Sequence, residues 1–479
     1  MRLSPPSRRR KRTQPVAGDW LRRLGWALGI VCLNISPALA AQRPVVLNVR
    51  QALEIALLNQ QGITGARAAI ASARAQRLGA LANFLPSLSL TDQPQHYHPL
   101  EQSSSTFIAG TLVPAPHAFF NNSASANFNL NLYAGGKDVA GYRAALAGVR
   151  SAKAGLSAAM NETFLQVLSA YEALAKDETT IAAQQRIVRI AQEISRLTEA
   201  RFKRRMASDI DWIQAQQQAL QAETQFSQNR QQAAADRQQL LRAMGYVAPL
   251  TGWEIQQRLP PSPSLPPGTF RPGLDPAVRA ADAQLQAAHD QVAAARAGYW
   301  PSVALTGQYN ALGVDPNAMG HAVTATHGRG YSVGFSVTVP LLPFFNTESA
   351  VETAQAQVES ALGADRNARV IAASRSEPAR LLYLEAQHSA RLARRSAALA
   401  CTNTRLTAAR YQARQSSRID LDKARLLAAQ AALAANTTRF DRRLAAWRLY
   451  RAMHPGRFAH TLWRAARGKK RSPPRQRPQ

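Results

Sequence analysis

Two aspartates occupy matching places in a segment that the chain contains twice. Residues 200–211 and 409–420 are identical at six of twelve positions, and the copies end at Asp211 and Asp420, 209 residues apart. An aspartate just after a turn commonly caps the next helix, because its carboxylate accepts hydrogen bonds from free backbone N–H groups. Capping is one interpretation of this pair, and a functional role of the two carboxylates is the other.

The sequence offers no catalytic or cofactor motif. It lacks the GxSxG, HExxH, P-loop and CxxC patterns, and a strand rather than a helix follows the glycines at 328, 330 and 334. Five of the nine histidines fall in two stretches between expected strands: His96, His98, His117, His321 and His327. No metal-ligand spacing recurs among them, which favours solvated loop histidines over a metal site. We therefore expect no enzyme activity, no cofactor and no bound metal.

Half of the formal net charge of +30 lies in the two ends of the chain. Residues 1–40 contribute +7 and place Arg residues before an apolar run, Leu24–Ile35, and a final Ala-Leu-Ala. This order is typical of a secretory signal peptide cleaved after Ala40. A membrane anchor is the alternative, but a run of about 12 apolar residues is too short to span a bilayer. Export would leave Cys401 as the only cysteine, so we expect no intrachain disulfide.

Residues 457–479 contribute the other +8 without any acidic residue. Such a segment is most often a disordered, solvated tail. Nucleic-acid binding is the functional alternative, because clustered Lys and Arg displace counterions from phosphates. An exported chain does not meet chromosomal DNA, so we expect no nucleic-acid partner.

Four segments alternate between apolar and polar residues, which is typical of strands with one wet face. They lie at residues 87–91, 127–132, 303–309 and 331–339. Strands of about nine to eleven residues can cross a membrane at a tilt, but four strands cannot close a barrel. Open edges in lipid would cost tens of kcal/mol, at several kcal/mol for each unpaired backbone group. The chain must therefore oligomerise or stay out of the membrane.

Long helical segments separate the strand pairs. After Gly136 nothing interrupts a helix for about 70 residues, or about 105 Å. Shorter helices at 49–85 and 209–244 would match that length if placed end to end. A second long helix is expected at 347–412, with a kink at Pro378. A helix at 275–299 precedes it in the chain, and a return helix that ends at Met453 follows it.

These elements define two structural repeats. The first comprises residues 41–245 and the second residues 274–456. Seven prolines between 246 and 273 predict a stiff, extended linker that joins them.

The chain resembles the TolC family of outer-membrane efflux proteins over roughly residues 45–455. The resemblance rests on the duplicated junctions Phe84–Ser87 and Tyr299–Ser302, on Leu132–Lys137 and Val339–Asn346, and on the segments that end in Asp211 and Asp420. It implies a mainly α fold with a transmembrane β-barrel. Three chains would complete one 12-stranded barrel in outer-membrane lipid, and their coiled-coil helices would form a tunnel across the periplasm.

The same resemblance implies a passive channel. Cargo would arrive from an inner-membrane pump of the RND, ABC or MFS type through a periplasmic adaptor, as in tripartite efflux or type I secretion. The alternative from another class is a basic coiled-coil structural or nucleic-acid-associated protein, suggested by the long helices and the charge. A signal peptide and four amphipathic strands disfavour it.

The resemblance also implies a periplasmic gate at the helix turns. Asp420 would belong to an acidic ring that narrows the entrance. Asp211 and Tyr411 would form a hydrogen-bonded link that helps to keep the tips closed.

Four tip residues depart from the family pattern. Ser416 stands in the place of a gating arginine, Lys423 in the place of a second ring aspartate, and Arg205 and Arg414 in the place of turn glycines. Because a cation replaces an acid, we expect a weaker attraction for cations at this entrance.

Overall fold

The computed structural model describes residues 45–98, 106–108, 111–113, 119–246, 253–256, 259–263, 272–315, 317–324, 326–341 and 345–467. The expected signal peptide and the last twelve residues lie outside these ranges. The elements from Val46 onward belong to one unit.

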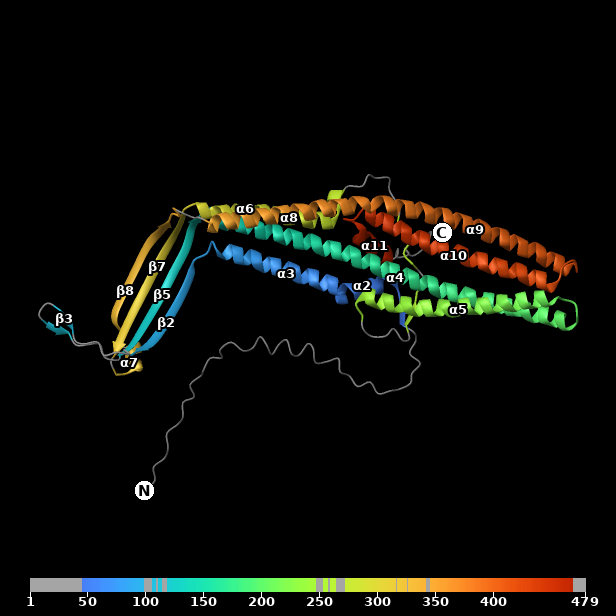
Figure 1. Ribbon diagram of the computed structural model, residues 1–479, viewed down its shortest axis with the longest axis horizontal. Coiled ribbons are helices and arrows are strands. Elements are labelled where there is room, and N and C mark those ends of the chain that lie inside the picture. The colour runs from blue at the N-terminus through green and yellow to red at the C-terminus, as the bar shows by residue number, and fades with distance from the viewer. Residues whose placement is uncertain are drawn as a thin grey trace, which may run out of the picture. The chain divides into compact units, whose positions relative to one another are not determined.

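Four long strands form an antiparallel sheet in the order β2-β5-β7-β8 (Figure 1). Their bounds are β2 Ser87–Tyr97, β5 Phe119–Ala134, β7 Ser302–Asp315 and β8 Thr326–Thr338. The strands lie where alternation predicted them, but they extend beyond the alternating segments and have 11, 16, 14 and 13 residues. They are longer because backbone pairing continues into polar stretches, where hydrophobic alternation gives no signal.

The register sorts the side chains of the sheet into apolar and polar rows. Leu88 pairs with Phe128, Phe128 with Gly307, and Gly307 with Val333. The adjacent row contains Ser89, Asn127, Gln308 and Ser332. One face of the sheet is therefore apolar across all four strands, and the other is polar.

The helices of the first half reproduce the expected length match. They are α2 Val49–Asn59, α3 Gln61–Ala82, α4 Lys137–Lys203 and α5 Asp209–Met244. Both α3 and α5 pack along α4, one toward each end (Figure 1). The segment expected as one helix at 49–85 is broken at Gln60, which has an extended backbone. Gly245, with φ +67°, lies so close to this break that a Cβ would be 2.8 Å from the Asn59 carbonyl oxygen.

The second half repeats this plan with α6 Pro276–Arg296, α8 Asn346–Ser374, α9 Ser376–Gln412 and α10 Arg418–Met453. α6 packs along α8 and α10 packs along α9. The interruption expected near Pro378 lies at Arg375, between α8 and α9. Proline has no N–H for the carbonyl four residues earlier, which here belongs to Ser374.

Short elements complete the fold. They are β1 Val45–Leu47, β3 Thr106–Ile108, β4 Thr111–Val113, β6 Trp253–Ile255, η1 Pro272–Leu274, η2 Ala297–Tyr299, α7 Met319–Thr324 and α11 Phe458–Arg467. β6 pairs with β1, so the expected linker at 246–273 contains a strand. The buried Tyr171 hydroxyl holds this pair to α4, at 2.8 Å from the Leu47 carbonyl oxygen and 2.7 Å from that of Gln256.

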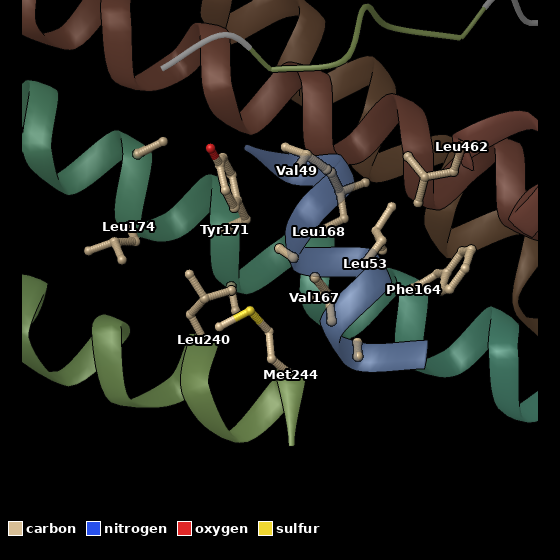
Figure 2. Close-up of a cluster of buried hydrophobic side chains, with 14 of the residues drawn as sticks. Val49, Leu53, Phe164, Val167, Leu168, Tyr171, Leu174, Leu240, Met244 and Leu462 are labelled. Atoms are coloured by element: carbon tan, nitrogen blue, oxygen red, sulfur yellow. The ribbon is translucent and has the colours of Figure 1, made fainter. Parts of the chain in front are cut away.

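The main core lies where α2, α4, α5, α10 and α11 meet (Figure 2). Leu53 of α2, Phe164 of α4 and Met244 of α5 are buried there together. Their burial removes apolar area from water, which is the main source of folding free energy.

The expected disorder of the tail is wrong for its first part. α11 places Phe458 and Leu462 in this core, with both side chains fully buried. Their spacing of four residues puts both side chains on one face of a helix. The many charged residues around them make this apolar face hard to recognise in the sequence. Residues 468–479 lie outside the described part of the chain.

Candidate functional site at the helix tips

Two tight turns lie at the same end of the helices and join α4 to α5 and α9 to α10 (Figure 1). Their backbones are alike. The Met206 N–H donates to the Arg201 carbonyl at 2.8 Å, and the Gln415 N–H donates to the Arg410 carbonyl at 2.8 Å. The duplication in the sequence is therefore a duplication of the turn geometry.

Each turn ends in a reciprocal capping box. The Asp211 N–H donates to the Ser208 hydroxyl oxygen at 3.1 Å, and the Asp211 carboxylate accepts from the Ser208 N–H at 3.2 Å. Ser417 and Asp420 repeat this arrangement at 3.1 and 3.0 Å. The serines are the N-caps and the aspartates lie three residues further on, so the expectation that the aspartates themselves are N-caps is corrected.

The serine hydrogen bonds also set the charge of both carboxylates. They stabilise the ionised form and lower the pKa of Asp211 and Asp420 below the ordinary value, and Lys423 lowers both further. Both aspartates are therefore charged at neutral pH.

We expect Ser208→Ala and Ser417→Ala each to lower the free energy of unfolding by about 1 kcal/mol, because each leaves a backbone N–H without its cap. Urea unfolding of the detergent-solubilised protein measures the loss. Ser227→Ala, in the exposed middle of α5, is the matched control and should be nearly neutral. Equal effects at all three serines would contradict the role of the caps.

Arg205 and Arg414 have left-handed backbone conformations, with φ of 56° and 61°. A residue with a Cβ is strained there by about 1–2 kcal/mol, whereas glycine is not. Glycine is the residue that the resemblance described above implies at both positions.

We expect Arg205→Gly and Arg414→Gly each to raise the free energy of unfolding by up to about 1 kcal/mol, part of the relief being lost to the greater freedom of unfolded glycine. Arg205→Ala and Arg414→Ala remove the same charge but keep the Cβ, so they should give no such gain. Indistinguishable glycine and alanine variants would show that charge, and not backbone strain, decides stability here.

The structure brings three of the predicted site residues together. Asp211, Asp420 and Lys423 line one cavity of about 240 Å³, with Arg201 and Ser417 among their neighbours. Arg201 and the two capping serines were not predicted, although Ser-x-x-Asp before a helix is a recognised capping signal.

Tyr411 and Ser416 lie elsewhere on the turn. The Ser416 hydroxyl donates to the Thr407 carbonyl at 3.4 Å, and the Tyr411 hydroxyl lies near Arg418, whose pKa it helps to raise. No hydrogen bond joins Asp211 to Tyr411 within the described chain, since Ser208 engages the Asp211 carboxylate. The link between them stays a prediction.

Metal binding and helical membrane spans find no support among the described residues. They contain no group of three or more His, Cys, Asp or Glu side chains that would hold a metal ion. His117 lies outside them. The described helices include none with enough apolar length to cross a bilayer.

The family profile described as outer membrane efflux protein matches residues 52–246 and 273–453. The chain belongs to the outer membrane efflux protein family. This outer membrane efflux protein is therefore an efflux channel located in the outer membrane, as predicted, and its family is one of transport channels and not of enzymes. The alternative of a basic coiled-coil or nucleic-acid-associated protein is not supported.

Solved structures share the fold of this efflux protein. A membrane protein from Pseudomonas aeruginosa aligns with a TM-score of 0.68 and 19% identity, over 86% of this chain and 91% of that one. VceC from Vibrio cholerae aligns with a TM-score of 0.66 and 19% identity, over 85% and 96%. The open state of MtrE from Neisseria gonorrhoeae aligns with a TM-score of 0.67 and 19% identity, over 85% and 89%. No curated protein sequence matches the chain.

Proposed function

We propose that three copies of this efflux protein form one continuous duct, which passively exports cargo delivered by an inner-membrane pump through a periplasmic adaptor. Tripartite efflux and type I secretion are the two settings that such a duct fits. The helix tips would form its periplasmic entrance, with Asp211, Tyr411 and Asp420 at the gate.

The observation that carries this proposal is the pair of open sheet edges. β2 and β8 are the outer strands of the described sheet, and each has a neighbour on one side only. An unpaired strand edge in lipid leaves backbone groups unsatisfied at several kcal/mol each. Pairing with other copies removes both edges at once.

The strand directions support a ring. All three neighbouring pairs in the sheet are antiparallel, so β8 runs opposite to β2. If β8 of one copy lay beside β2 of the next, the whole sheet would stay antiparallel. Such a head-to-tail contact closes into a ring when the rotation permits, and three copies would give twelve strands.

The helices offer matching unpartnered edges. In the half of the helical region that ends at the two turns, the helices pack side by side in the order α9-α10-α4-α5. α9 and α5 are therefore the outermost helices. Leu392, Leu399 and Leu406, spaced by seven on α9, are 52–72% exposed. Ile213 and Leu220 on α5 are about half exposed as well. Apolar seams of this kind commonly pack against another helix.

Membrane fractionation tests the proposal. We expect the mature protein in the outer-membrane fraction, migrating as a species of three chains that dissociates on heating. Recovery as a soluble single chain would contradict it. Comparing the drug and metal susceptibility of a deletion strain with that of its complemented parent would then narrow the cargo.

A further inference from the structure

The helix tips carry an excess of positive charge. The two copies of the tip segment, residues 199–216 and 408–425, contain nine Lys or Arg and five Asp or Glu, a net of +4 per chain. A ring of three chains would therefore gather +12 at one end of the duct.

Four of the five acidic residues at the tips are already engaged. Glu199 pairs with Lys203 at 2.7 Å, and the buried Asp422 pairs with Arg418 at 2.8 Å and with Arg425 at 3.1 Å. Asp211 and Asp420 accept the capping hydrogen bonds of Ser208 and Ser417. Of the five acidic residues, only Asp209 has neither an ion pair nor a cap to hold.

Most of the cations at the tips are not paired. Arg204, Arg205, Arg410, Arg414 and Lys423 are all exposed, and none of them forms an ion pair with a carboxylate of the described chain. Lys423 also shares a cavity with Asp211 and Asp420, where its charge offsets theirs.

We propose that this entrance attracts anions and that the duct favours cargo carrying net negative charge. The inference rests on the proposed trimeric duct, because only a ring of tips makes a shared entrance. Charges of one sign around a narrow opening focus the field and raise the local concentration of counterions. A potential of about one kT already concentrates a monovalent anion about threefold.

Reversal potentials in planar bilayers under a KCl gradient test the selectivity. The purified trimer is expected to pass chloride in preference to potassium. Lys423→Glu changes the charge of the ring by two units per chain, or six in all. It should lower the chloride-to-potassium permeability ratio about threefold. Arg464→Glu makes the same change on the exposed face of α11 and should leave the ratio unchanged. A potassium preference in the unaltered trimer would overturn the inference and leave the duct standing, whereas failure to form a trimer would overturn the duct.

If the trimer passes no current, fluorescence quenching tests whether its entrance attracts anions. Trp212, which stacks on Phe202 with ring centroids 5.1 Å apart, lies beside Asp211 and reports on the tip. The difference in emission between the unaltered protein and Trp212→Phe gives the signal of Trp212 alone. Iodide should quench that signal about threefold more effectively than caesium, and Lys423→Glu should reduce the difference. Equal quenching by both ions, or stronger quenching by caesium, would contradict an anion-attracting entrance.

Discussion

Val333→Lys is expected to abolish assembly of the trimer in the outer membrane, whereas Ser332→Lys is expected to be tolerated. Val333 is 74% exposed in one chain and belongs to the apolar row with Gly307, Phe128 and Leu88. In a closed barrel this row would face lipid. A lysine near the bilayer midplane costs about 2–4 kcal/mol, and a trimer contains three of them.

Ser332 is the matched control because it is the next residue on the same strand. It belongs to the polar row with Gln308, Asn127 and Ser89, which would face the lumen. The amount of heat-dissociable trimer in outer-membrane fractions measures both effects. A greater loss of trimer in Ser332→Lys than in Val333→Lys would mean that the sheet faces lipid with its other side.

The free energy of unfolding is expected to fall as the pH rises from about 5 to 8, and Glu172→Gln is expected to make this fall shallower. The Glu172 side chain is almost fully buried, and neither of its carboxylate oxygens has a hydrogen-bond partner in the described chain. Burial raises its pKa from 4.5 to about 8. Arg443 and Arg448 lower it in part, and Asp441 opposes them.

The direction follows from proton linkage. Between the unfolded pKa near 4.5 and the folded pKa near 8, the folded state binds more protons than the unfolded state, so a rise in pH favours unfolding. The slope is at most about 1.4 kcal/mol per pH unit, which amounts to several kcal/mol over the window. Below about pH 4.5 the group contributes no such loss.

Urea unfolding at several pH values gives the profiles. Burial and the neighbouring Asp236 raise the pKa of Asp177 to about 7, so Asp177 adds a slope of the same sign. The difference between the profiles of the unaltered protein and of Glu172→Gln therefore isolates the contribution of Glu172. Glu385→Gln, on the exposed face of α9, is the matched control. Parallel profiles for the unaltered protein and Glu172→Gln would show that Glu172 is not protonated in the folded state.

The sequence was a good guide where hydrophobic period or chain punctuation determines the structure. The 67-residue α4 begins after the Gly135–Gly136 break, and the strands lie where apolar and polar residues alternate. The interruption expected at Pro378 also occurs, three residues earlier at Arg375. These features depend on local backbone chemistry, which a single sequence contains.

The elements that the sequence does not predict depend on distant contacts. The break at Gln60 accommodates Gly245, 185 residues further on, and β6 forms by pairing with β1 at the other end of the first repeat. In the sequence of α11 the charge is more conspicuous than the apolar face, and charge alone indicates a solvated tail. Partners this far apart leave no local signal.

The features of the helix tips also divide into those that local sequence predicts and those that depend on distant contacts. The duplicated segments located both turns, and the Ser-x-x-Asp spacing was available to identify the caps. The meeting of Asp211, Asp420 and Lys423 around one cavity required the packing of α4, α5 and α10, which no spacing along the chain predicts.

Cysteine cross-linking between β2 and β8 tests most directly the claim that the two open edges meet between copies. Ser89→Cys is combined in turn with Ser332→Cys, Ser336→Cys and Thr338→Cys in a Cys401→Ser background, which removes the exposed natural thiol. β5 and β7 lie between the two strands within one chain, so only neighbouring copies bring the cysteines within the 4.4–6.8 Å Cα separation of a disulfide. At least one pair is expected to give covalent species of up to three chains on non-reducing gels. Single chains for every pair, in protein recovered from the outer membrane, would contradict it.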